Sequence, residues 1–280
     1  MARALPLSDE TVARDRADSV VRLEAVFEEA WIERLLAGFG EVVERPGPLS
    51  RVYADERDGA GQYFLFDMVN WTRIEAFRAF LAEAPAAAIA GQLMGANQAR
   101  LLHDTIFFRA RGTQAPSPFH QDMPYWPVKG RQACSIWMPL VPVAKQSALA
   151  FVPGSHRWEK DFARPKFSAS DPHDLKSEAE SYAALPPVEA NQSRYGVVSW
   201  DMAPGDCVVF DAMVLHGGSG RLAPDRELRV FATNWIGDDV RASVRPGGVD
   251  PDFYSVFAHY GLREGDPLDC PAFPLLWSRS

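Results

Sequence analysis

The chain has 280 residues, of which 47% are hydrophobic and 24% are charged, as is typical of a soluble globular protein. Its 29 basic and 37 acidic residues give a net charge of −8, which argues against nucleic acid or an anionic membrane as a general partner. The three cysteines are isolated, so neither a disulfide framework nor a thiolate zinc site is expected. Because we recognise no transmembrane run and no secretory leader, we expect a cytoplasmic protein.

The first hundred residues predict mainly helices. Apolar side chains recur near helical spacing over residues 19–39, which indicates a first helix. Asn70 or Thr72 would cap a second helix, and residues 84–96 are expected to form a third. Between the first two helices, residues 63–69 have the pattern of a strand.

After residue 100 the apolar segments become short and are separated by Pro, Gly and Asp. The predicted strands are residues 104–109, 133–140, 149–152, 207–210 and 229–236. Several short strands divided by turn residues favour a β-sandwich or barrel, so we expect a mainly β fold with flanking helices.

We expect one domain over residues 1–280. Its predicted parts are a helical N-terminal support (1–100), a β core (about 60–240), an insertion or lid (about 159–195) and a C-terminal tail (241–280). The insertion is polar and lacks a clear period, and long segments of that kind are more often functional than structural. Within it, Tyr182, Arg194 and Tyr195 are candidates to close over a substrate.

Three residues have the chemistry of a metal site. His120 and Asp122 form a His-x-Asp pair, and on an extended segment the two side chains would share a face. His216 lies 94 residues after Asp122, behind a Pro-Gly-Asp turn and an apolar strand. Two imidazoles and one carboxylate form the facial triad of non-haem Fe(II) oxygenases, which leaves three coordination positions open. The alternative is that each histidine is an ordinary surface or core residue.

An arginine follows the second histidine. Arg229 begins the strand-like run at residues 229–236, and a guanidinium on a buried strand is costly unless an anion meets it. A dicarboxylate co-substrate would supply that anion, because the arginine fork binds a carboxylate through two parallel hydrogen bonds. Arg226, in a charged loop, is the rival candidate.

Taken in order, five blocks of the sequence resemble the phytanoyl-CoA dioxygenase family of Fe(II)- and 2-oxoglutarate-dependent oxygenases. The resemblance extends over roughly residues 60–240. The blocks are Phe119-His120-Gln121-Asp122, Phe151-Val152-Pro153-Gly154-Ser155-His156, Pro204-Gly205-Asp206, His216-Gly217-Gly218-Ser219-Gly220 and Arg229.

The resemblance implies a double-stranded β-helix, the jelly-roll fold of cupin-like proteins, with iron and 2-oxoglutarate as cofactors. By position it makes His120, Asp122 and His216 the iron ligands and Arg229 the partner of the distal 2-oxoglutarate carboxylate. Trp137 stands where relatives keep an aromatic residue near the co-substrate, although core packing explains it equally well. Relatives often place a lysine on the strand before His-x-Asp, and here the candidate for that second contact is Arg109.

These site assignments predict an activity. We expect an oxygenase that uses dioxygen to hydroxylate an unactivated C–H bond of a small metabolite or natural-product intermediate, with release of succinate and CO2. Because a halogenase on this scaffold replaces the carboxylate with a small residue, Asp122 favours oxidation over halogenation. Expected substrate contacts are Met123, Tyr125, Trp126, Phe66 and Trp235, for which plain core packing is the alternative.

Three other readings stay open. The same cofactor chemistry gives desaturation, epimerisation or cyclisation, because the pose of the substrate decides where the radical goes. A cupin-type iron enzyme without 2-oxoglutarate would not need Arg229. A non-catalytic jelly roll that binds a ligand or a structural metal is the alternative of another class.

Overall fold

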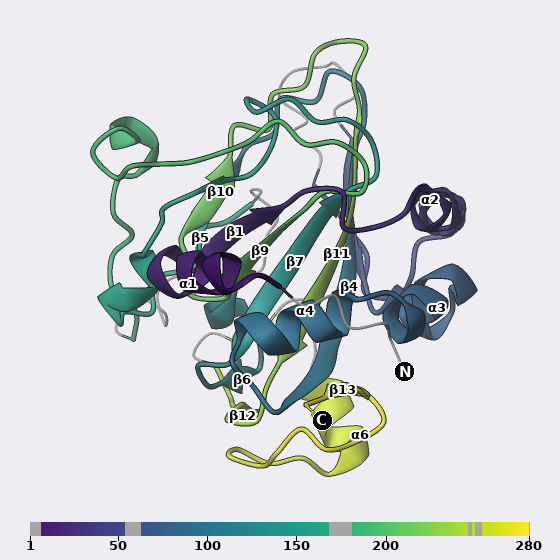
Figure 1. Cartoon of the computed structure of the whole chain (residues 1–280), viewed down its shortest axis with the longest axis vertical. Helices are drawn as coiled ribbons and strands as arrows, with labels where there is room; N and C mark the ends of the chain where they lie inside the picture. Colours follow the sequence, from purple (N-terminus) through teal and green to yellow (C-terminus); the bar gives the residue numbers. More distant parts are fainter. Residues whose placement is uncertain (1–6, 54–62, 168–180, 246–247, 250–253, 280) are drawn as a thin grey trace.

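The computed structural model describes residues 7–53, 63–167, 181–245, 248–249 and 254–279 (Figure 1). Its helices are α1 (Asp9–Asp18), α2 (Glu29–Glu44), α3 (Glu75–Glu83), α4 (Ala86–Leu93) and α6 (Tyr254–Tyr260). Short 3-10 turns are η2 (Asn70–Thr72), η3 (Met123–Tyr125), η4 (Ser155–Trp158) and η5 (Glu189–Asn191).

The strands form three antiparallel sheets. The major sheet has the order β1-β9-β7-β11-β4-β3-β2, with β13 also pairing with β4; the minor sheet has the order β5-β10-β8; and β12 pairs with β6. The strands are β1 (Val20–Leu23), β2 (Arg51–Val52), β3 (Phe64–Met68), β4 (Gln98–Arg109), β5 (Ser117–His120), β6 (Val128–Lys129), β7 (Ala133–Pro139), β8 (Ala150–Phe151), β9 (Cys207–Asp211), β10 (His216–Gly218), β11 (Leu228–Ile236), β12 (Arg241–Ala242) and β13 (Leu275–Ser278).

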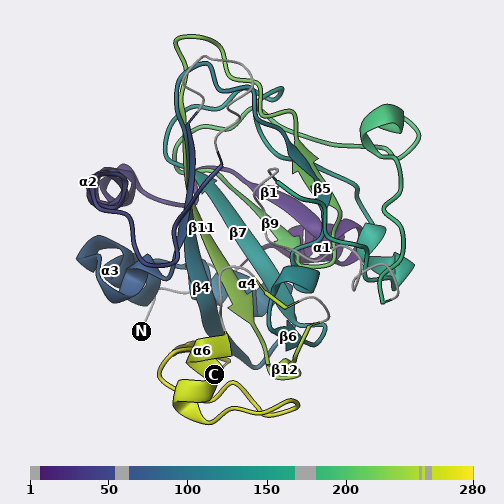
Figure 2. The same ribbon diagram turned by 180° about the vertical axis from the view of Figure 1, so that it is seen from behind.

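Helices cover the outer face of the major sheet. In Figure 1, α4 lies in front of β7, β11 and β4, and in the view from behind it lies beyond these strands (Figure 2). Phe77 and Phe80 of α3 contact Phe231 of β11 with ring centroids 4.5 Å and 5.6 Å apart, and all three side chains are buried. This aromatic cluster anchors the helices to the sheet through the hydrophobic effect.

The minor sheet faces the other side of the major sheet. Residues from both sheets line one cavity, among them His120 and His216 from the minor sheet and Ser135 and Asn234 from the major sheet. Two antiparallel sheets that enclose a ligand-sized space give a mainly β jelly-roll core with flanking helices, as the sequence predicts.

The structure corrects the first predicted helix. Residues 19–39 do not form one helix, because Val20–Leu23 is strand β1 and Val21 pairs with Val209 of β9. The backbone then turns through Ala25, which has a positive φ of 50°, and α2 begins at Glu29. Two consecutive valines fit an extended strand better than a helix, and the spacing of the later apolar residues hid that signal.

Helix capping and strand limits also differ from prediction in part. Asn70 and Thr72 form a 3-10 turn and do not cap α3, which begins at Glu75 after Ile74. Strand β4 begins at Gln98, six residues before the predicted start. The sequence pattern missed β10, whose three residues are too short to show a period.

The polar segment 159–195 is only partly described, because residues 168–180 lie outside the described ranges. Its described part makes a bridge between Phe162 and Ala183 and contains the turn η5. The predicted limits of the insertion, the N-terminal support and the tail stay predictions. Over the described ranges, no helix is long and apolar enough to cross a bilayer.

Candidate active site

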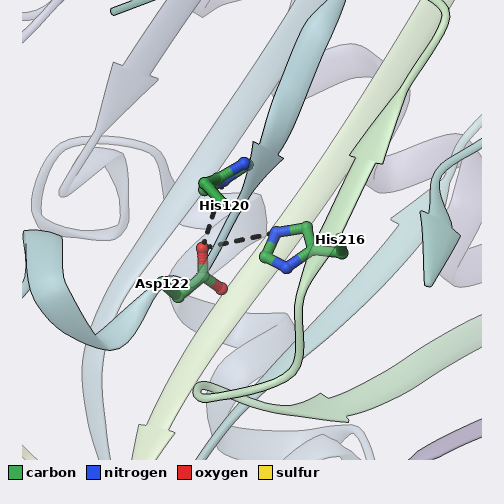
Figure 3. A group of neighbouring side chains, drawn as sticks. All are labelled: His120, Asp122 and His216. Carbon is green, nitrogen blue, oxygen red and sulfur yellow. Dashed lines mark ion pairs between the residues drawn. The ribbon is translucent and has the colours of Figure 1, made fainter. Parts of the chain in front are cut away.

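His120, Asp122 and His216 converge at one end of the minor sheet (Figure 3). His120 ends β5 and His216 begins β10, and the two residues are direct partners in the antiparallel register. Asp122 Oδ1 lies 3.7 Å from His120 Nε2 and 3.5 Å from His216 Nε2. The three potential ligand atoms all lie within 4.8 Å of one another.

The His-x-Asp pair meets for a different reason than the sequence argument gave. The strand ends at His120, and Asp122 has helical backbone angles (φ −73°, ψ −42°) at the start of η3. The expectation that both side chains share one face of an extended segment is therefore wrong. A tight turn after the strand brings the carboxylate back toward the imidazoles.

Both imidazoles are held in one tautomer. His120 Nδ1 lies 2.8 Å from the Pro118 carbonyl oxygen, and His216 Nδ1 lies 3.0 Å from the Val214 carbonyl oxygen. Because a carbonyl only accepts hydrogen bonds, each Nδ1 carries the proton and each Nε2 keeps a lone pair. This arrangement, in which the outer nitrogen is fixed by a hydrogen bond, is the usual one for histidine ligands of metals.

Burial sets the protonation of these groups. It lowers the pKa of His120 and of His216 to about 4, so both rings are neutral at pH 7. Neutral imidazole is the form that binds a metal. Burial also raises the pKa of Asp122, against the opposing effects of His120 and of the Ser135 hydroxyl. A buried carboxylate of this kind gains a counter-charge when a cation binds.

The donor set fits a divalent metal ion. Two donor atoms that occupy neighbouring coordination positions about 2.1 Å from an ion lie about 3 Å apart. Asp122 Oδ1 lies 3.5 Å and 3.7 Å from the two imidazole nitrogens, so small side-chain shifts would bring the three donors onto one ion. Two imidazoles and one carboxylate on one side of the ion match the facial triad used for ferrous iron.

The triad opens into a cavity of about 160 Å³. Five of the other residues that the sequence analysis selected line it: Phe66, Arg109, Tyr125, Trp126 and Trp137. Sequence reasoning missed further lining residues that carry polar or aromatic groups. They are Tyr53, Phe64, His103, Thr105, Phe107, Ser117, Ser135, Ser147, Phe167, Phe210 and Asn234.

Arg109 is a buried cation in this cavity. It is 5% exposed, and its guanidinium donates hydrogen bonds to the Ala115 carbonyl and, over 2.8 Å, to Ser117 Oγ. Its guanidinium carbon lies 4.3 Å from the centre of the Phe64 ring. Among the described residues no carboxylate is within ion-pairing distance, and burial lowers its pKa to about 10, which leaves it charged at pH 7. A buried, unneutralised cation of this kind marks a site for an anion.

The structure does not place Arg229 in the cavity, which corrects the sequence prediction. Arg229 lies on the outer face of β11, where Nε is 2.8 Å from Glu227 Oε1 and the guanidinium lies over the rings of Phe39 and Phe108. Side chains alternate along a strand, so the inward position at this end of β11 belongs to Leu228. Leu228 is paired directly with Arg109 of β4.

Two predicted substrate contacts are core residues instead. Trp235 is fully buried on the outer face of β11, and its Nε1 donates to Thr233 Oγ1 over 2.8 Å. Met123 is 4% exposed in an apolar cluster with Trp126 and is not among the residues that line the cavity. For both residues the alternative of plain core packing holds.

The first part of the insertion reaches the site. Phe167 packs edge-on against His120 with ring centroids 5.0 Å apart, and Tyr125 donates a hydrogen bond to the Pro165 carbonyl over 3.0 Å. The three residues proposed to close over a substrate do not line the cavity: Tyr182 is buried, Arg194 is exposed and Tyr195 is half-buried.

Solved structures share this fold. The non-heme alpha-ketoglutarate-dependent carbocyclase SnoK from nogalamycin biosynthesis has a TM-score of 0.71 at 20% identity, over 97% of each chain. The epimerase SnoN from the same biosynthesis has a TM-score of 0.70 at 20% identity, over 97% of this chain and 96% of its own. EctD from S. alaskensis, with 2-oxoglutarate and 5-hydroxyectoine, has a TM-score of 0.65 at 19% identity, over 93% of this chain and 85% of its own.

No curated protein sequence matches the chain. The family model described as phytanoyl-CoA dioxygenase (PhyH) matches residues 17–226, three quarters of the chain. The match includes His120, Asp122 and His216 and ends before Arg229. The chain therefore belongs to the phytanoyl-CoA dioxygenase family.

Proposed function

We propose that this protein is an Fe(II)- and 2-oxoglutarate-dependent oxygenase that acts on a small molecule. The observation that carries the proposal is the convergence of two neutral imidazoles and one carboxylate at the wall of a cavity that also holds a buried arginine. His120, Asp122 and His216 would hold the iron, and three coordination positions would stay open. Membership of the family supports the same cofactor pair.

Arg109 would bind the distal carboxylate of 2-oxoglutarate. The guanidinium is already oriented by two hydrogen bonds to the segment at residues 115–117, which reduces the ordering cost of binding an anion. Trp137 lines the same cavity and is buried among Phe210, Leu228 and Ala232. We assign Trp137 to the apolar wall beside the co-substrate. We do not assign Arg229 to the cofactor site, because it lies on the outer face of β11.

When bound, iron and 2-oxoglutarate would supply the oxidative chemistry for a C–H bond, with dioxygen as the oxidant and succinate and CO2 as co-products. The protein supplies binding, orientation and exclusion of water. Phe167, Tyr125 and Phe210 pack around the two imidazoles and keep the metal side of the cavity apolar. His120 and His216 keep their Nδ1 protons on backbone carbonyls, so Nε2 stays available throughout.

The proposed substrate is an uncharged, largely apolar or aromatic small molecule. Phe66, Tyr125 and Trp126 line the cavity, and Tyr53 and Phe167 extend the aromatic surface. Among the described residues that line the cavity, Asp122 is the single acidic one, and a bound metal ion would neutralise its charge. A positively charged substrate would therefore lack a partner, whereas a flat ring would gain dispersion and stacking contacts.

Hydroxylation is the leading outcome for that substrate, with epimerisation or cyclisation as the second candidate. The similarity in fold to a carbocyclase and an epimerase favours the second candidate. The ligand set is the same for all of these reactions, and the position of the substrate hydrogen decides among them. The complete triad argues against the non-catalytic alternative. The cytoplasmic location expected from the sequence stays a prediction.

The test is an anaerobic titration of the metal-free protein with Fe(II) in the presence of 2-oxoglutarate. Chelation of iron by the keto acid should give a visible charge-transfer band, which the Asp122→Ala variant should not form. A screen of small aromatic and apolar metabolites for succinate release in air then identifies the substrate class. Absence of the band after Fe(II) and 2-oxoglutarate are added to the folded protein would refute the assignment.

A further inference from the structure

The second oxygen of the Asp122 carboxylate has a partner of its own. Ser135 Oγ lies 2.6 Å from Asp122 Oδ2, while Oδ1 faces the two imidazoles. Ser135 is in the middle of β7, is 2% exposed, and also lies 2.8 Å from Asn234 Oδ1. The carboxylate is thus held from one side by the major sheet and faces the minor sheet with its other oxygen.

The contact to Asp122 ends a row of buried polar side chains across three strands. Ser135 of β7, Asn234 of β11 and His103 of β4 are direct neighbours in the register. The Asn234 amide nitrogen lies 3.0 Å from His103 Nδ1, which is 3.1 Å from Thr105 Oγ1. All four residues line the cavity and are at most 5% exposed.

Such a row is costly in a wall whose other members are mostly apolar. Valine or leucine would fill the same positions without burying polar groups, whereas each polar group left unsatisfied there would destabilise the fold. Ser135, the first member of the row, contacts Asn234 on one side and Asp122 on the other, so the row ends at the carboxylate. Its position and direction therefore point to the carboxylate.

Counting protons gives the direction of the hydrogen bonds when a metal is bound. A metal-bound carboxylate only accepts, and Ser135 has a single hydroxyl proton, so that proton goes to Asp122 Oδ2. Ser135 Oγ can then accept a hydrogen bond from Asn234 only if the amide turns over, which exchanges the positions of Oδ1, now beside Ser135, and of the amide nitrogen, now beside His103. An amide, which both donates and accepts, satisfies both neighbours, and a carboxylate or an alkyl group at residue 234 would not.

The backbone explains why the carboxylate needs this support. His120 and His216 are partners in a β-ladder, whereas Asp122 lies on the turn that follows β5. We propose that Ser135, held in place by Asn234, is a positioning residue that fixes the Asp122 carboxylate with Oδ1 toward the two imidazoles and so raises the affinity for the metal. This inference rests on the proposed metal site. Partners of this kind typically change metal affinity by about 10- to 100-fold.

The test measures metal binding directly. The full-length, metal-free Ser135→Ala variant is titrated anaerobically with Mn²⁺, and the free ion is followed by its paramagnetic resonance signal. We expect affinity to fall by about 10- to 100-fold, and Ser135→Thr, which keeps the hydroxyl, should restore most of it. Ser199→Ala is the matched control, because its hydroxyl lies within hydrogen-bond distance of the Lys145 and Leu149 carbonyl oxygens and is not among the cavity-lining groups. This control should bind Mn²⁺ like the wild type.

Asn234→Leu provides a second arm that does not depend on the fold of the Ser135 variants. The leucine keeps the side-chain volume but removes the hydrogen bond that holds Ser135, so we expect Mn²⁺ affinity to fall less than in Ser135→Ala. The double variant should bind Mn²⁺ no more weakly than Ser135→Ala alone. Unchanged Mn²⁺ affinity in folded Ser135→Ala and Asn234→Leu, with binding abolished by Asp122→Ala, would overturn this inference alone. Unchanged binding in Asp122→Ala would instead overturn the metal site itself.

Discussion

The inner and outer faces of the major sheet are built from the same strands, but they differ in what they contribute. Along β11, the side chains of Leu228, Ala232 and Asn234 line the cavity, whereas Phe231 and Trp235 pack under the helices. The outer face is mainly an apolar core, in which Thr233 and Asp104 are also buried, whereas the inner face carries a larger set of buried polar and charged groups. The outer face therefore accounts for stability and the inner face for binding.

The largest expected effect lies on the outer face. Phe231→Ala removes a fully buried ring that contacts Phe77 and Phe80, and we expect the free energy of unfolding to fall by about 3–5 kcal/mol. Denaturant titration measures this loss. Mn²⁺ affinity of the folded fraction should be unchanged. Loss of metal binding in that fraction would show that the two faces are coupled.

The next effect lies on the inner face. Arg109→Gln removes the cation but keeps hydrogen-bonding capacity, and loss of a charge-assisted contact of about 1.5–3 kcal/mol corresponds to about 10- to 150-fold weaker 2-oxoglutarate binding. Anaerobic titration of the charge-transfer band with 2-oxoglutarate measures the change. If the band of Arg109→Gln saturated at the same 2-oxoglutarate concentration as that of the wild type, Arg109 would not be a cofactor contact.

A glycine behind Arg109 gives an intermediate effect. Gly220 has a φ of 66°, and a Cβ there would lie 1.7 Å from the Ala115 carbonyl oxygen, which accepts from Arg109. Gly196 has a similar φ of 60° with open space around it, so Gly196→Ala is the matched control for backbone strain of about 1–3 kcal/mol. Both variants should lose stability, but only Gly220→Ala should also weaken 2-oxoglutarate binding. Equal 2-oxoglutarate affinities would show that the 115–117 segment does not fix Arg109.

The smallest effect is expected at the other arginine. Arg229→Gln removes a half-buried ion pair with Glu227, and we expect a stability change of about 1 kcal/mol or less. The 2-oxoglutarate titration should match that of the wild type, because Arg229 lies on the outer face. A loss similar to that of Arg109→Gln would reverse the assignment of the two arginines.

The sequence was informative where chemistry alone identifies a residue. Two histidines and an aspartate next to turn-forming and strand-forming segments predicted the convergent triad, although Asp122 reaches it by a turn and not along a strand. Family resemblance singled out Arg109 and Trp137, and both line the cavity. Their roles in binding the co-substrate remain proposals.

The sequence failed where the phase of a strand decides the outcome. Residues 230–236 are all buried because both faces of β11 are covered, and polar and apolar residues do not alternate along them, so the pattern does not show which side faces inward. Arg229 and Trp235 were assigned to the wrong face for this reason. Likewise, Val20–Leu23 becomes a strand through pairing with β9, a partner almost 190 residues away that local spacing does not reveal.

The two histidines of the proposed metal site occupy one rung of a β-ladder, whereas the aspartate enters from a turn outside that ladder. A substitution at Asp122 therefore leaves the strand pairing, and the imidazole pair it carries, in place. A single substitution can therefore replace the third ligand and change the chemistry at the metal. The pocket that binds the organic molecule would stay the same. Divergence of reaction type and of substrate choice can thus proceed separately in this fold.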